Sequence, residues 1–104
     1  MARMSNTTYI KSFLVTVAAS GTPVQATSYA IPEGVEVLVT ASTGNTGTVT
    51  VGSTSAEAIY TSTNNKPLEA GQAVGYQVRD TQILWFDSTV SADTINVSFE
   101  YELI

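Results

Sequence analysis

Apolar and polar side chains alternate along much of this chain, and the alternation is clearest between residues 95 and 103. The odd positions there are Ile, Val, Phe, Tyr and Leu, whereas the even positions are Asn, Ser and Glu. A period of two is that of a β-strand, because successive side chains of a strand point to opposite faces of its sheet. The segment therefore predicts a strand with one dry and one wet face, which is typical of an antiparallel sheet.

Weaker versions of the same pattern predict seven further strands. They cover residues 13–18, 24–30, 35–40, 48–51, 58–62, 73–78 and 82–87. Residues 13–18 are largely apolar at odd and even positions alike, so this strand is expected to be covered on both faces. The run from Ile83 to Phe86 is too short for a helix and predicts a buried strand. No segment shows the 3.6-residue period of an amphipathic helix.

Turn-forming residues separate nearly all of these segments. The strongest turn signal is Gly-Asn-Thr-Gly at 44–47, which predicts a hairpin because Gly and Asn tolerate positive φ. About eight short, mainly antiparallel strands predict an all-β fold: a β-sandwich of the jelly-roll or immunoglobulin-like type, or a small barrel. We expect residues 1–8 to be an N-terminal arm or frayed end, and residues 9–104 to be a single domain.

The chain contains no His and no Cys. It therefore lacks the commonest general base, the commonest metal ligand and any thiolate. Asp80, Asp87 and Asp93 lie near one another in sequence, but their spacing fits no calcium loop. Asp80 and Asp93 are better interpreted as turn residues, whose carboxylates bond to backbone. The sequence predicts no enzyme activity, no cofactor and no metal site.

Charged residues make up only 12% of the chain, against a typical ~25%, and the net charge is −5. The four cations, Arg3, Lys11, Lys66 and Arg79, do not cluster. Binding to phosphates or to an anionic membrane relies on clustered cations, so we expect neither a nucleic acid nor a membrane as a partner. A surface of Thr, Ser, Asn and Gln is easily desolvated and suits contact with other proteins.

Aromatic side chains offer two kinds of role. Trp85 and Phe86 lie beside other apolar residues and are expected in the core, whereas Tyr29 and Tyr60 lie in polar segments and are expected at the surface. Exposed aromatics suit a protein interface. As an alternative, the five aromatics Trp85, Phe86, Tyr76, Tyr29 and Tyr60 could line a sugar-binding platform, because flat apolar rings stack on sugar faces. The predicted interface residues are Arg3, Met4, Tyr9, Tyr29 and Tyr60.

The segment from Gly44 to Gly52 resembles one that is common in small structural proteins of tailed-phage virions. In those proteins an Asn-Thr-Gly turn leads into a short strand that ends Val-Gly. The elements that follow match the run Leu68-Glu69-Ala70-Gly71-Gln72, the strand at 73–78, Phe86-Asp87 and the strand at 95–103. Ala70 and Gln72 stand where Pro and Glu are usual. The resemblance covers most of residues 13–103.

The resemblance implies a capsid decoration (cement) protein, which binds the outer face of a phage capsid shell and stabilises it. Its partner would be the major capsid protein, and such proteins often form homotrimers. The chain would be made in the host cytoplasm and located on the capsid surface of the virion. Two alternatives stay open: a head-fibre base, tail or adaptor component of the virion, and a glycan-binding or adhesion module.

Overall fold

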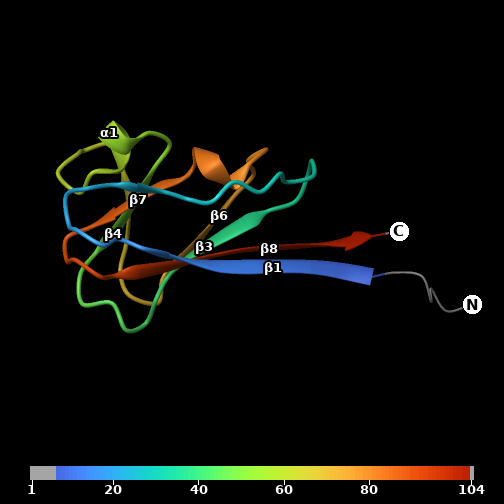
Figure 1. The fold of residues 1–104 in the computed structure, drawn as a ribbon, viewed down its shortest axis with the longest axis horizontal. Coiled ribbons are helices and arrows are strands. Elements are labelled where there is room, and N and C mark those ends of the chain that lie inside the picture. Colours follow the sequence, from blue (N-terminus) through green and yellow to red (C-terminus); the bar gives the residue numbers. More distant parts are fainter. Residues whose placement is uncertain (1–6, 104) are drawn as a thin grey trace, which may run out of the picture.

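Eight antiparallel strands form two four-stranded sheets that pack as a sandwich in the computed structural model, which describes residues 7–103 (Figure 1). The strands are β1 (Thr7–Thr16), β2 (Val24–Gln25), β3 (Val37–Ala41), β4 (Val49–Gly52), β5 (Lys66–Leu68), β6 (Ala73–Tyr76), β7 (Trp85–Ser88) and β8 (Thr94–Leu103). A helical turn, α1 (Ser55–Ala58), and a 3₁₀ turn, η1 (Thr81–Ile83), complete the secondary structure.

The strand order is β1-β8-β3-β6 in sheet A and β2-β7-β4-β5 in sheet B. Strand β1 pairs with β8, β2 with β7, β3 with β6 and β4 with β5, all antiparallel. In these pairs the first strand along the chain pairs with the last, the second with the seventh, and so on inward. The pairs alternate between the two sheets, which is the topology of a jelly roll. The prediction of a β-sandwich is confirmed, and of the architectures left open the jelly roll is the one observed.

The core lies between the sheets and is built from the inward-facing side chains of the strands. The buried apolar side chains are Val15, Val17, Ala26, Ile31, Val37, Val39, Ala41, Val49, Val51, Leu68, Leu84, Phe86, Ile95, Val97 and Phe99. In β8, Ile95, Val97 and Phe99 are buried, whereas the residues between them are exposed or half-buried. The predicted alternation of this strand is confirmed.

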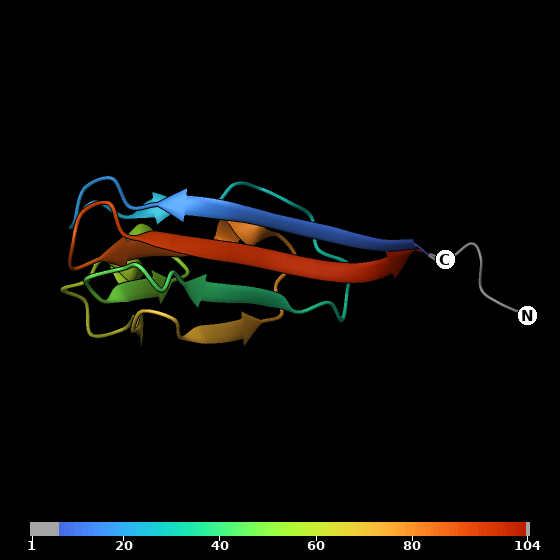
Figure 2. The ribbon, with the colours of Figure 1, turned by 90° about the horizontal axis from the view of Figure 1, so that it is seen from below.

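The expectation that residues 13–18 are covered on both faces is wrong. Val15 and Val17 are buried, but Leu14 is 60% exposed. Among residues 7–103, no helix or strand covers the outer face of sheet A (Figure 2). The strand also begins earlier than predicted, because Thr7 and Thr8, placed in the predicted arm, form the start of β1. The rest of that arm, residues 1–6, lies outside the described residues.

The strand predicted over residues 58–62 is wrong, and β5 takes its place as the eighth strand. The chain forms α1 instead, where the Thr54 side chain accepts a hydrogen bond from the Glu57 N–H (3.1 Å). This Thr-Ser-Ala-Glu order is that of a capping box. Strand β5 contains Pro67, which cannot donate to a ladder, and tolerates it because β5 is an edge strand.

The turn at residues 44–47 is not a hairpin, so that prediction is wrong. It connects β3 in sheet A to β4 in sheet B, and these strands do not pair. The positive-φ glycines of the described chain are Gly21, Gly34 and Gly71. Gly47 is not among them. A glycine is required at this position because a Cβ would lie only 2.5 Å from Thr89 Oγ1.

Other predicted strands are shorter than expected, and the one at 73–78 ends at Tyr76 as β6. Residues 24–30 form only β2 and an isolated bridge between Ala30 and Asp80. Residues 81–83 form η1, so Ile83 is 47% exposed rather than buried. Phe86 is fully buried as expected, whereas Trp85 is half-buried at the start of β7.

Candidate functional site

Strands β1 and β8 extend beyond the rest of the sandwich as a two-stranded projection (Figures 1 and 2). The pairing of β3 with β8 stops at Leu38 and Ser98, whereas the pairing of β1 with β8 continues to Thr7 and Leu103. We call residues 7–11 and 99–103 the terminal ribbon. It accounts for much of the elongation of the molecule, whose principal extents are 54 × 25 × 18 Å.

One face of the terminal ribbon is aromatic. The ring centroid of Tyr9 lies 5.2 Å from that of Tyr101 and 6.2 Å from that of Phe99, and Phe99 and Tyr101 are parallel at 6.3 Å. Phe99 is buried, but Tyr9 is 36% exposed. Aromatic side chains bury large areas and dominate the energetics of interfaces, so this face is suited to contact with a partner.

The aromatic face is continuous with the core of the sandwich through Tyr29. This residue lies in the β2–β3 connection, with its ring 5.2 Å from Phe13 and 6.3 Å from Phe99. The Lys11 ammonium lies 4.8 Å from the centroid of the same ring, within cation–π distance. These contacts fix the inner part of the aromatic face and leave its outer part, at Tyr9 and Tyr101, for a further contact.

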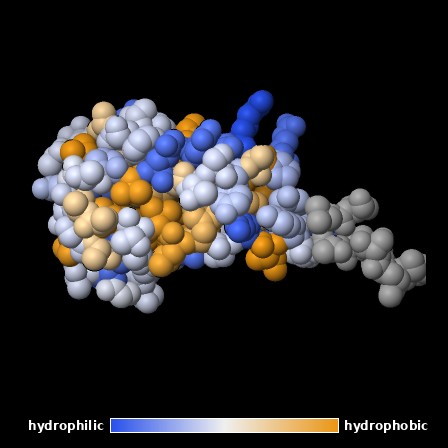
Figure 3. All heavy atoms as spheres, in the orientation of Figure 1, coloured by the Kyte–Doolittle hydropathy of each residue, from blue (hydrophilic) through white to orange (hydrophobic). Residues whose placement is uncertain are grey.

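The opposite face of the ribbon and of sheet A exposes aliphatic side chains. Ile10 is 66% exposed, and Leu14 and Leu38 are exposed on the same outer face. A shallow hollow of about 290 Å³ lies beside them, lined by Ile10, Glu36, Leu38, Ser98, Phe99 and Glu100. Residues of high hydropathy are visible on the body of the sandwich and again farther along the projection (Figure 3). Because Tyr9 is partly exposed on one face of the ribbon and Ile10 on the other, both faces are partly apolar.

Strand β1 is the edge strand of sheet A over its whole length. An edge strand presents unpaired backbone groups that can pair with another chain, and proteins usually protect such edges with charges, prolines or bulges. The ten residues of β1 contain one charge, Lys11, and no proline. The edge is long, weakly charged and open to pairing.

The three aspartates that the sequence singles out are structural acceptors. Asp80 caps η1, where its carboxylate accepts hydrogen bonds from the Gln82 N–H (2.9 Å) and the Ser28 hydroxyl (2.9 Å). Asp87 is fully buried and accepts from the N–H groups of Gly21 (3.0 Å) and Tyr60 (2.8 Å). Each therefore holds neighbouring loops to the sandwich.

Asp93 is also buried, and its carboxylate accepts hydrogen bonds from the N–H groups of Thr46 (3.2 Å) and Gly47 (3.0 Å) and from the Ser88 hydroxyl (2.7 Å). The interpretation as turn residues is confirmed for Asp80, whereas Asp93 bonds to a different turn from its own. Between residues 7 and 103, no group of three or more His, Cys, Asp or Glu side chains could hold a metal ion.

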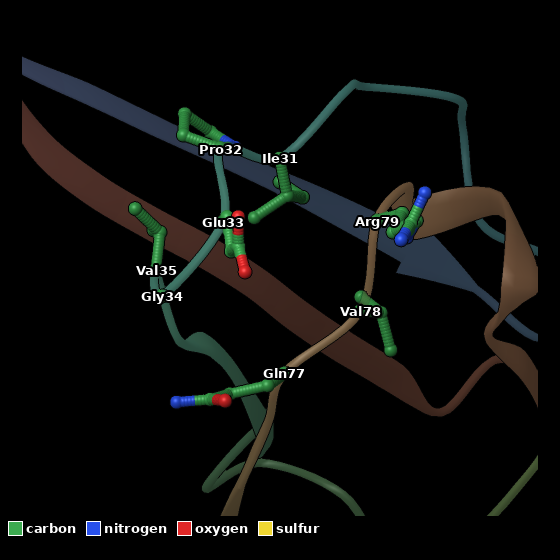
Figure 4. A pocket seen from close by; sticks show the side chains of 8 residues that line it. All are labelled: Ile31, Pro32, Glu33, Gly34, Val35, Gln77, Val78 and Arg79. Carbon is green, nitrogen blue, oxygen red and sulfur yellow. The ribbon is translucent and has the colours of Figure 1, made fainter.

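A hollow of about 430 Å³ separates the β2–β3 connection from the segment that follows β6 (Figure 4). Its lining residues are Ile31, Pro32, Glu33, Gly34, Val35, Gln77, Val78 and Arg79. One carboxylate and one guanidinium stand among them, which is neither a carboxylate pair nor a nucleophile beside a base. No helix of the described part of the chain is long and apolar enough to cross a membrane.

The predicted interface residues are not brought together as one set. Arg3 and Met4 lie outside the described residues. Tyr9 and Tyr29 belong to one aromatic cluster because both contact Phe99. Tyr60 is 42% exposed but lies after α1, against Gly21 and Asp87.

Sequence reasoning missed the outer-face residues Ile10, Leu14 and Leu38. The available signal, for Leu14 alone, was that residues 13–18 at the end of β1 are largely apolar at odd and even positions alike. That signal was interpreted as a strand with two buried faces.

The chain was compared with models of protein families, with curated proteins and with solved structures, and none of the three comparisons gave a match. The fold defines the chain as a jelly-roll β-sandwich with a projecting two-stranded ribbon.

Proposed function

We propose that this chain is a structural protein of a tailed-phage virion, and specifically a capsid decoration protein that binds the outer face of the shell and stabilises it. The proposal joins the sequence resemblance to one structural observation: the terminal ribbon exposes apolar side chains on both of its faces. Tyr9 lies on one face and Ile10 on the other. A two-stranded ribbon is marginally stable alone, so a partner that covers it would stabilise it.

The low charge of the surface supports the same role. Decoration of a shell relies on many weak contacts that are repeated by symmetry, and an uncharged Thr/Ser surface is easily desolvated at each contact. The proposed partner is the major capsid protein. A location in a head fibre, tail or adaptor would use the same ribbon and belongs to the same class of virion component.

The proposed assembly in solution is a homotrimer. The open edge of β1 lies on one side of the ribbon, and on the other side the sheet ends at β8 once β3 has stopped. Contact between the β1 side of one copy and the β8 side of the next is heterologous, and such contacts close into a ring when the rotation between copies allows it. Light scattering of the purified chain measures its mass, and a monomeric mass would contradict the trimer.

Shell binding is tested by adding the purified chain to source-phage capsids that lack it and measuring the bound fraction. The double variant Tyr9→Ser/Ile10→Ser removes one apolar side chain from each face, each worth about 1.5–3 kcal/mol when fully buried. We therefore expect the affinity for the shell to fall at least about tenfold.

Ile83→Ser and Val90→Ser are the controls, because both residues are exposed, apolar and outside the ribbon. They should bind shells as the unmodified chain does. A cryo-EM map of the source particle provides the decisive observation: a map whose shell lacks this domain would exclude decoration. Deleting residues 1–6, which leaves the ribbon whole, tests the rest of the predicted arm, and unchanged occupancy of the shell would exclude a role for it.

A further inference from the structure

A third hollow, of about 770 Å³, opens beside η1 and is distinct from the terminal ribbon. Its polar lining consists of Gln25, Ser53, Gln77, Arg79, Asp80 and Gln82. Trp85, Ile83 and Val78 supply the apolar part. Its volume is within the range of sites that bind small molecules, and its lining, with six polar and three apolar residues, is more polar than is usual for such sites.

The polar groups of this hollow are available to a ligand. The side chains of Gln77, Arg79 and Gln82 are exposed and form no hydrogen bond within residues 7–103. The Gln25 amide donates to the Gln82 backbone carbonyl (2.7 Å), which leaves its own carbonyl oxygen as an acceptor. Planar amides and a guanidinium thus stand around the hollow with unused donors and acceptors.

The wall that carries these groups is held in place before any ligand binds. Asp80 caps η1, and Ala30 pairs with Asp80 in an isolated bridge. The buried Thr81 hydroxyl accepts from the Tyr29 N–H (2.9 Å) and donates to the Thr27 carbonyl. A wall fixed in this way loses little conformational entropy when a ligand binds, which favours affinity.

The chemistry of the lining points to an uncharged, hydroxyl-rich ligand. The face of an indole carries partial negative charge and packs well against polarised C–H groups, such as those on one face of a pyranose ring. Sugar hydroxyls both donate and accept, so they match amides that do the same. Arg79 and Asp80 carry opposite charges side by side, so the hollow has no excess charge to attract an ion.

We propose that this hollow binds a neutral saccharide, stacked on Trp85 and hydrogen-bonded by Gln77, Arg79 and Gln82. The proposal does not rest on the virion role, because none of these residues belongs to the terminal ribbon. It also accounts for the exposure of Ile83, which lies in the apolar part of the lining. The chain would then carry two surfaces, one for assembly and one for a glycan.

Trp85 is the only tryptophan of the chain, so its fluorescence reports on this hollow alone. The full-length chain is titrated with lactose, maltotriose, mannotriose and triacetylchitotriose, each to about 10 mM, which nearly saturates a site with a Kd of 1 mM. We expect a saturable change in emission with at least one of them. No saturable change with any of the four would overturn the proposal.

Side-chain truncation then locates the site. Arg79→Ala should weaken binding about tenfold and Gln77→Ala about threefold, in line with the loss of a charged and of a neutral hydrogen bond. Both residues are exposed, so the unfolding midpoints should not change. Gln72→Ala is the matched control, since Gln72 is an exposed glutamine outside the hollow, and should bind as the unmodified chain does. Unchanged affinity in both Arg79→Ala and Gln77→Ala would overturn the proposed site.

Discussion

Replacing Asp93 by Ala should destabilise this protein more than the same replacement at the half-exposed Asp80. The carboxylate is buried and accepts three hydrogen bonds, from Thr46 N–H, Gly47 N–H and the Ser88 hydroxyl. The hydroxyl keeps an acceptor in the Thr48 carbonyl at 3.2 Å, so the loss falls mainly on the two backbone N–H groups.

The expected magnitude follows from the surroundings of those two groups. A buried donor left without an acceptor costs about 1–3 kcal/mol. Gly47 is half-buried and lies toward the upper end of this range, whereas Thr46 is exposed and can be solvated, so it lies toward the lower end. Together they give a loss of about 3 kcal/mol, a large part of the 5–15 kcal/mol typical of a domain.

Urea unfolding followed by circular dichroism measures this loss. With a slope of about 1–3 kcal/mol per M, a loss of about 3 kcal/mol lowers the midpoint by roughly 1–3 M. Asp93→Asn should cost less, because its remaining oxygen still serves one N–H and the Ser88 hydroxyl can turn to accept from the new amide. Asp80→Ala, which loses a half-exposed cap, should cost about 1 kcal/mol. A midpoint for Asp93→Ala equal to or above that of Asp80→Ala would refute the reasoning.

Three further predictions concern packing, pH and the exposed face of sheet A. Gly52→Ala places a Cβ 2.6 Å from the Ala58 backbone nitrogen. The clash should destabilise the protein by about 1–3 kcal/mol in the same unfolding assay. An unchanged midpoint would contradict the contact between α1 and β4. Burial raises the pKa of the Tyr76 hydroxyl above its ordinary value of 10.0. The unfolded chain therefore loses this proton first, and stability should fall as the pH rises above about 10. Tyr76→Phe should lack the part of this fall that Tyr76 causes. The unfolding free energies of the variant and of the unmodified chain are therefore measured against pH, and parallel profiles would contradict the raised pKa. Leu14→Ser removes an exposed side chain and should change the unfolding free energy by no more than about 0.5 kcal/mol, and a larger loss would show that the outer face of sheet A is covered.

The sequence predicted the class and the number of strands better than their positions. The alternation in β8 was predicted correctly over residues 95–100, because Ile95, Val97 and Phe99 are buried in the core whereas the residues that alternate with them face outward. Strand β5 was missed because it is three residues long and contains Pro67, and such a segment has no detectable period. The predicted strand at 58–62 was wrong because Ala58 ends α1 and is buried on the outer face of sheet B, whereas Tyr60 is exposed. There, the Thr50 hydroxyl donates to the Ala58 carbonyl.

The candidate sites show the same division. Tyr29 and Tyr60 were expected at the surface, but only Tyr60 is exposed, because Tyr29 is half-buried against Phe13 and Phe99. The sequence could not show that Tyr9 lies on a projecting ribbon and Tyr60 beside α1. The hollow at Trp85 draws its lining from β2, β6–η1 and β7, which are far apart along the chain. No local pattern can indicate a surface that is assembled from such distant segments.

The sequence alone determined that this protein is all-β, because alternation with a period of two reflects a property of the strand backbone itself. It also determined that His and Cys chemistry is absent, since that depends on composition only. The tertiary structure decided which strands pair and that the turn at 44–47 crosses between the sheets. It also decided that β1 and β8 extend beyond the ends of the neighbouring strands. These features depend on which distant segments meet in the core, and the free energy of that choice is shared among many small contacts rather than encoded in any one segment.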